Sequence, residues 1–137
     1  MLPAKTKIKR KAPINKPGYR ILLVDDEKVN NPTISELLIN AGYHVGIASD
    51  EVNARIEINN NHFDLILSDS EVSNLTEVQL LEILKEHKLK IPVIFLTSNI
   101  TRNPKINELK TGTVEYLKKP VDNEALLLRF KTLLHHR

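Results

Sequence analysis

Five short apolar runs, each followed by a segment with helical spacing, constrain the fold of this chain of 137 residues more than any other feature. The clearest runs are ILLV at 21–24, LIL at 65–67 and VIFL at 93–96, and weaker ones lie at 45–48 and 114–117. Continuous apolar runs of this length are typical of strands that are covered on both faces. The alternation therefore predicts an α/β fold, a doubly wound five-stranded parallel sheet with helices on both sides.

The segments between the runs carry the start and stop signals of five helices. Pro is tolerated in the first turn of a helix, Asp can cap its N-terminus, and Gly often follows its last turn. Gly42 is therefore expected to close the first helix, and the fourth helix, at 105–110, has the weakest pattern because it is short and polar. The expected first residues or caps are Pro32, Asp50, Thr76, Lys105 and Asp122.

Length and composition exclude several classes of protein. The chain suits one compact domain, and the absence of Cys excludes disulfides and Cys-ligated metals. No apolar run approaches the roughly 20 residues that span a bilayer, and the N-terminus lacks the apolar segment of a secretory signal. We therefore expect a cytoplasmic protein.

Basic residues are concentrated at the N-terminus. The first 20 residues contain seven Lys or Arg and no acidic residue, whereas the rest contains 13 basic and 17 acidic residues. Residues 1–18 also hold three Pro, and we expect them to form a disordered basic arm before a domain at 19–137. Such an arm can contact nucleic acid or an acidic membrane surface. A solvated tail that binds nothing specific is the simpler interpretation.

Polar residues follow most of the apolar runs, where the strands are expected to end. Ligands bind at the carboxyl ends of the strands in open parallel sheets, which makes these residues candidates for function. They are Asp25, Asp26, Asp69, Thr97, Ser98, Lys118 and Lys119. Carboxylates that converge in one pocket repel each other, and a hard cation such as Mg²⁺ removes the repulsion. A nearby hydroxyl and ammonium group would suit a phosphoryl group, and an aspartate can be the nucleophile.

Four segments resemble the signature segments of response-regulator receiver domains in two-component signalling, the class that includes chemotaxis regulators. They are LLVDDE at 22–27, DLILSD at 64–69, IFLTS at 94–98 and YLKKP at 116–120, and the resemblance covers about residues 19–137. It implies a flavodoxin-like sheet of order 2-1-3-4-5. It also implies a regulatory switch that takes a phosphoryl group from a sensor histidine kinase or phosphotransfer protein. Such a domain catalyses only its own phosphorylation and dephosphorylation.

The resemblance assigns the metal and acceptor residues. Asp69 corresponds to the phosphoacceptor. Asp26 corresponds to a direct Mg²⁺ ligand and Asp25 to the acid that holds metal-bound water. Asp69 and the backbone carbonyl of Glu71 would complete the metal site.

The resemblance also assigns the residues that would respond to phosphorylation. Thr97 corresponds to the switch hydroxyl, Lys119 to the lysine that pairs with the phosphoryl group, and Tyr116 to the aromatic residue whose rotamer follows the switch. Glu71 and Asn99 stand where family members border the attacking water of dephosphorylation. The face formed by helix four, strand five and helix five would contact partners or form a homodimer.

The chain departs from the family pattern beside the expected acceptor. Val72-Ser73 and Thr76-Glu77 stand where the family often has Met-Pro and Asp-Gly, and without Gly the backbone at residue 77 is expected to keep a negative φ. A pseudo-receiver that acts only as an interaction module therefore remains an alternative. Another is a phosphohydrolase with Asp69 as nucleophile and Glu71 as second acid, although no lid domain is evident. Taken singly, the candidates also have structural explanations, such as a helix cap for Asp25 and core packing for Tyr116.

Overall fold

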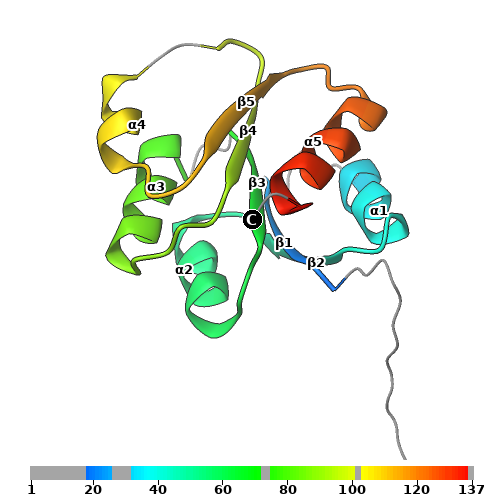
Figure 1. Ribbon diagram of the computed structural model, residues 1–137. Coiled ribbons are helices and arrows are strands. Elements are labelled where there is room, and N and C mark those ends of the chain that lie inside the picture. Colours follow the sequence, from blue (N-terminus) through cyan, green and yellow to red (C-terminus); the bar gives the residue numbers. More distant parts are fainter. Residues whose placement is uncertain (1–17, 26–31, 72–74, 101–102, 136–137) are drawn as a thin grey trace, which may run out of the picture.

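The computed structural model describes residues 18–25, 32–71, 75–100 and 103–135, and strands and helices alternate along them. The strands form one parallel sheet in the order β2-β1-β3-β4-β5 (Figure 1). They are β1 (Arg20–Val24), β2 (His44–Ala48), β3 (Leu65–Asp69), β4 (Val93–Thr97) and β5 (Val114–Lys118). The helices are α1 (Pro32–Asn40), α2 (Glu51–Asn60), α3 (Glu77–Glu86), α4 (Pro104–Leu109) and α5 (Asn123–His135). The expected fold class and strand order are confirmed.

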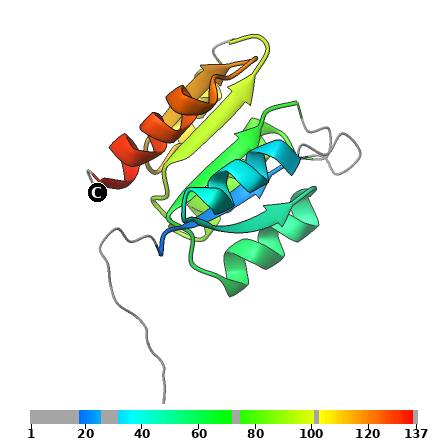
Figure 2. The same cartoon turned by 90° about the vertical axis from the view of Figure 1, so that its right-hand side faces the viewer.

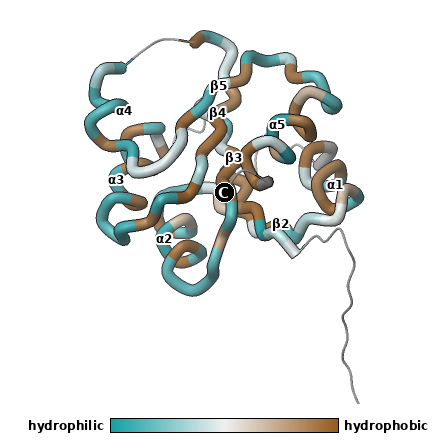
Figure 3. The backbone as a smooth tube through the Cα atoms, viewed as in Figure 1, coloured by the Kyte–Doolittle hydropathy of each residue, from teal (hydrophilic) through white to brown (hydrophobic). Residues whose placement is uncertain are grey.

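Each face of the sheet has its own hydrophobic core, because successive strand residues point to opposite sides. Leu22 and Ile66 belong to the core under α2, α3 and α4. Their neighbours Ile21 and Leu65 belong to the core under α1 and α5. Figures 1 and 2 show the two layers, with α1 and α5 lying across one side of the sheet. In Figure 3 the central strands are largely brown, whereas the covering helices are mixed brown and teal, as expected for a buried sheet beneath amphipathic helices.

The first helix ends where Gly42 takes a backbone conformation that other residues avoid. Gly42 has φ +100°, and the N–H of Tyr43 donates to the carbonyl of Leu38 over 3.1 Å. The N–H of Gly42 also donates to the carbonyl of Ile39 over 3.0 Å. These two bonds form a Schellman motif, which satisfies the last carbonyls of α1. The expected stop at Gly42 is confirmed, and Ala41 lies in the closing turn.

The N-terminal caps expected at three helices are also present, whereas α4 begins at Pro104, one residue before its expected start, and is capped by Asn103. Asp50 accepts a hydrogen bond from the N–H of Asn53 over 2.8 Å, and Asp122 accepts one from the N–H of Ala125 over 3.0 Å. Thr76 begins α3 with a reciprocal capping box to Gln79. Because each cap fixes where a helix starts, it also fixes the length of the loop that crosses the carboxyl ends of the strands.

The helices α4 and α5 differ in how much apolar surface they bury. In the six-residue helix α4 the buried residue is Ile106, so this helix packs by a small surface. In α5, Leu126, Phe130 and Leu134 are buried at a spacing of four residues, whereas Leu128 is 65% exposed. One stripe of α5 therefore packs on the sheet, and part of its apolar surface remains outside. No helix among the described residues is long and apolar enough to cross a membrane.

Candidate functional site

The residues expected to be functional gather at the carboxyl ends of the central strands. Asp69 is the last residue of β3 and lies in register with Leu96 of β4. Thr97 ends β4 beside Lys118 of β5, and Lys119 follows directly. The parallel register therefore brings three segments that are far apart in the sequence to one edge of the sheet.

The ammonium group of Lys119 forms an ion pair with Asp69. Its Nζ lies 2.9 Å from Oδ1 and 2.9 Å from Oδ2 of Asp69, and the two side chains are 29% and 24% exposed. The backbone N–H of Lys119 donates to the carbonyl of Thr97 over 2.8 Å, which fixes where its side chain begins. The chain can end a buried strand in a carboxylate because this partner offsets the cost of burying the charge.

The neighbouring carboxylates also stabilise the protonated form of Lys119. Partial burial lowers the pKa of Lys119, but its hydrogen bonds with Asp69 and Glu71 outweigh burial, and the pKa is raised on balance. Lys119 is therefore a permanent cation at neutral pH. Its one positive charge is shared by two carboxylates, those of Asp69 and Glu71.

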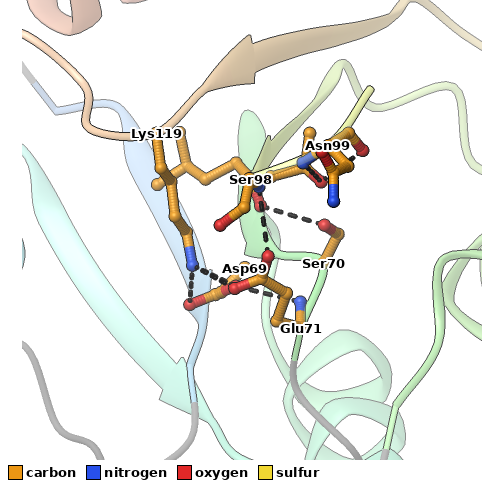
Figure 4. A network of polar contacts seen from close by, with 8 residues as sticks. Asp69, Ser70, Glu71, Ser98, Asn99 and Lys119 are labelled. Carbon is orange, nitrogen blue, oxygen red and sulfur yellow. Dashed lines mark hydrogen bonds and ion pairs between the residues drawn. The ribbon is translucent and has the colours of Figure 1, made fainter. Parts of the chain in front are cut away.

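Glu71 connects the loop after β3 to the residues that follow β4 and β5 (Figure 4). Its Oε1 lies 3.0 Å from Nζ of Lys119, and its Oε2 accepts a hydrogen bond from the N–H of Ser98 over 3.1 Å. The backbone N–H of Glu71 donates to Oδ1 of Asp69 over 2.9 Å. The hydrogen bonds from Lys119 and Ser98 lower the pKa of Glu71 to about 2. The side chain is therefore a carboxylate at neutral pH and lies across the site.

A serine holds the same loop to the sheet. The N–H of Ser70 donates to the carbonyl of Leu96 over 2.9 Å, and its hydroxyl donates to the same carbonyl over 3.0 Å. Ser70 could not be identified as a site residue from the sequence, because a serine after a strand carries no specific signal. Its two bonds to β4 fix the backbone between Asp69 and Glu71.

The hydroxyl of Thr97 forms hydrogen bonds with the loop that follows β4. Thr97 is 5% exposed. Its Oγ1 donates to the carbonyl of Asn99 over 2.9 Å and accepts from the N–H of Asn99 over 3.2 Å. The structure thus brings Thr97 and Asn99 together, and Thr97 has to give up these bonds before its hydroxyl can point elsewhere.

Tyr116 is fixed between a core ring and a carboxylate. Its ring packs on Phe95 with centroids 5.5 Å apart, and its hydroxyl donates to Oε1 of Glu77 over 2.9 Å. Glu77 is the first residue of α3, and no described non-Gly residue other than Lys88 has a positive φ, as expected for residue 77. The sequence singled out Glu77 only as a departure from the family pattern. A contact between residues 39 apart could not be read from spacing.

The described carboxylates suit a hard cation, although they form only part of the expected metal site. Asp25 follows β1 and is half-buried, and its N–H donates to the carbonyl of Ala48 over 3.0 Å. Val24 and Ser68 are in register, so Asp25 and Asp69 follow at adjacent strand ends. Oxygen donors of this kind are those that Mg²⁺ prefers. Among the residues with described positions, no group of three or more potential ligands gathers.

Three of the sequence-based expectations fall outside the described residues. These are the metal role of Asp26, the loop at Val72-Ser73 and the basic arm up to residue 17. The remaining candidates all lie at the carboxyl-terminal edge of the sheet or on the adjoining strand β5. Such an arrangement can bind a cation through carboxylates and a phosphoryl group through Lys119.

Several known proteins are similar to this chain in sequence. A family model described as the response regulator receiver domain matches residues 21–131. A probable transcriptional regulator, ycf29, from Porphyra purpurea is 38% identical over 120 residues, which cover 86% of this chain and 57% of that protein. The chain spans about half the length, or less, of curated relatives such as this one.

Solved structures with the same fold include two receiver domains. The receiver domain of a Francisella response regulator matches with a TM-score of 0.73 and 30% identity, over 87% of this chain and 98% of that chain. The receiver domain of a sensor histidine kinase from Pseudomonas aeruginosa matches with a TM-score of 0.72 and 28% identity, over 86% of this chain and 98% of that chain. That structure holds a magnesium ion in its active site cleft.

Proposed function

The chain belongs to the family of response regulator receiver domains, and we propose that it is an active receiver whose phosphoacceptor is Asp69. A sensor histidine kinase or a phosphotransfer protein would supply the phosphoryl group as a phosphohistidine. The observation that carries the proposal is the pairing of Asp69 with Lys119. The acceptor carboxylate remains 24% exposed at a strand end, and a cation lies 2.9 Å from both of its oxygens.

The proposed reaction uses Asp69 as the nucleophile. One carboxylate oxygen attacks the phosphorus, a new P–O bond forms, and the P–N bond to the donor imidazole breaks with its electron pair returning to that ring. The ammonium of Lys119 offsets the negative charge that gathers on the phosphoryl oxygens. Positioning and charge neutralisation supply most of the catalysis in phosphoryl transfer, and both are available at this edge. The domain would thus act on itself rather than on a separate substrate.

Mg²⁺ is the cofactor that this donor set fits. Asp25, Asp26 and Asp69, together with the backbone carbonyl of Glu71, would hold it. When bound, the cation would neutralise carboxylate and phosphoryl charge. The related Pseudomonas aeruginosa receiver holds magnesium in its cleft, which supports the same cofactor for this chain.

The response to phosphorylation would pass through Thr97 and Tyr116. The Thr97 hydroxyl would leave Asn99 and donate to a phosphoryl oxygen, and Tyr116 would give up its bond to Glu77. Tyr116 also lines a surface hollow with Ile106 and Val114. A change of its rotamer would therefore alter the surface of α4 and β5, where the output partner would bind.

The proposed function also includes a homodimer and residues that set the lifetime of the phosphoryl group. The exposed Leu128 on α5 would take part in a homodimer through the α4–β5–α5 face. Glu71 and Asn99 would tune the lifetime of the phosphoryl group by ordering or repelling the attacking water. The domain would span 19–137 and lie in the cytoplasm, and nucleic-acid contact by the basic segment 1–18 is the less favoured role.

The proposal is tested by intact-mass spectrometry after incubation with Mg²⁺ and acetyl phosphate. We expect one phosphoryl adduct on the wild type and none on Asp69→Asn. The matched control Asp122→Asn, which keeps a capping side chain on α5, should be modified like the wild type. A folded wild type that binds Mg²⁺ and takes no adduct would refute the proposal and favour a pseudo-receiver that acts only as an interaction module.

A further inference from the structure

The side chain of Glu71 accepts hydrogen bonds from two donors that lie near Asp69, the ammonium of Lys119 and the backbone N–H of Ser98. One carboxylate oxygen is 3.0 Å from Nζ of Lys119, and the other accepts the backbone N–H of Ser98 over 3.1 Å. Figure 4 shows the two contacts spanning the gap between the ends of β4 and β5. A single carboxylate thus joins a side-chain donor and a backbone donor of this site.

These two donors are the ones that an anion attached to Asp69 would need. Lys119 already contacts both oxygens of Asp69, so it is within reach of any group added there. Ser98 follows Thr97 at the end of β4, whose residue Leu96 is in register with Asp69. Carboxylate and phosphoryl oxygens accept the same charge-assisted hydrogen bonds. Two anions cannot share one backbone N–H at full strength, so a phosphoryl group and Glu71 would compete.

We propose that Glu71 is an internal anion that occupies the phosphoryl-binding donors of the unmodified domain and has to leave them when Asp69 is phosphorylated. This inference rests on the proposed function and goes beyond it, since it concerns the state before the reaction. It gives Glu71 an autoinhibitory role in phosphorylation, separate from the effect on dephosphorylation proposed above.

The position of Glu71 permits such an exchange. Its side chain is 48% exposed, so it can turn into solvent without opening the core. Its backbone N–H is bound to Asp69 and the preceding Ser70 is bound to β4, so the displacement would involve the side chain alone. Because binding effects are reciprocal, a phosphoryl group that displaces Glu71 is itself bound less tightly than it would be at free donors.

The experiment compares wild type, Glu71→Gln and Glu71→Ala in the rate of adduct formation with Mg²⁺ and acetyl phosphate. Glu82→Gln, which removes the same charge from an exposed residue of α3, is the control. We expect the Glu71 variants to react about two- to fivefold faster than wild type, the range that corresponds to an exposed ion pair. Glu82→Gln should react like wild type.

A second readout does not depend on the reaction. In heteronuclear NMR of the unmodified proteins, the amide proton of Ser98 should shift upfield in Glu71→Ala, because it loses a carboxylate acceptor. An unchanged Ser98 amide, or equal reaction rates in wild type and both Glu71 variants, would overturn the inference and leave Asp69 as the acceptor. An equal acceleration by Glu82→Gln would also overturn it, since general charge repulsion would then suffice. If none of the four proteins took an adduct, the proposed function would be refuted and the inference would fall with it.

Discussion

The hydrogen bond between Tyr116 and Glu77 gives a prediction that links the stability of the domain to its switching. The phenolic hydroxyl donates to the Glu77 carboxylate over 2.9 Å and joins β5 to the start of α3. Tyr116→Phe removes this bond while leaving the packing of the ring on Phe95 in place. Glu77→Gln keeps an acceptor at the same length but removes its charge.

The expected magnitude follows from the burial of the pair. A hydrogen bond to a charged group typically contributes about 1.5–3 kcal/mol. Both side chains are half-buried, so water competes for each of them. We therefore expect a coupling energy of about 1 kcal/mol, near the upper end for partly exposed charged pairs. Such a loss would lower the midpoint of urea unfolding by about 0.5 M.

The assay is urea unfolding of the wild type, the two single variants and the double variant. The double-mutant cycle isolates the coupling between the two side chains. Tyr43→Phe serves as the matched control, because Tyr43 packs into the core on the opposite face of the sheet. Adding Mg²⁺ and beryllofluoride, a phosphoryl analogue, should abolish the coupling if Tyr116 leaves Glu77 on activation. Additive single effects without the analogue would refute the bond, and a coupling that persists with the analogue would refute its role in switching.

Three further predictions follow from single contacts. Glu71→Ala should change the rate at which the phosphoryl adduct decays, as followed by intact mass, and an unchanged rate would exclude a role in its lifetime. Gly42→Ala should destabilise the fold by about 1–2 kcal/mol in urea unfolding, because a Cβ disfavours positive φ, and an unchanged midpoint would contradict this. The bonds to Arg55 lower the pKa of Glu86; the stability that Glu86 adds is therefore present above its unfolded pKa, about 4.3, and is lost as the pH falls through the lower folded value. The difference in urea midpoint between wild type and Glu86→Gln should shrink on acidification, and a constant difference would count against it.

The expected positions of the functional residues could be read from the sequence because of a general property of parallel sheets. The carboxyl ends of all strands meet at one edge, so a polar residue that follows an apolar run is placed there without knowledge of any contact. Asp69 and Lys119 illustrate this, since each was expected at the carboxyl end of a strand, and the structure shows them 2.9 Å apart at this edge. The caps at Asp50 and Thr76 were predictable for a similar reason, because each satisfies the backbone of its own helix.

The side-chain hydrogen bonds around the site could not be predicted in the same way. The bonds of Glu71 to Ser98 and of Tyr116 to Glu77 depend on loop conformation and side-chain rotamers, which leave no periodic trace in the sequence. The hydroxyl of Thr97 shows the same limit. Its position at the end of β4 was predictable, whereas its bonds to Asn99 depend on the turn that follows.

The position of β3 in the middle of the sheet has a consequence for how a signal can leave the site. The strand is bonded along one edge to β1 and along the other to β4, so its backbone belongs to the part of the chain expected to exchange amide protons most slowly. Moving Asp69 by moving its strand would require two ladders to open together. The proposed acceptor is therefore a fixed point, and a signal would pass outward through rotating side chains and the turns that hold them. A redesigned sensor could replace those turns while leaving the reacting group and its anchorage untouched.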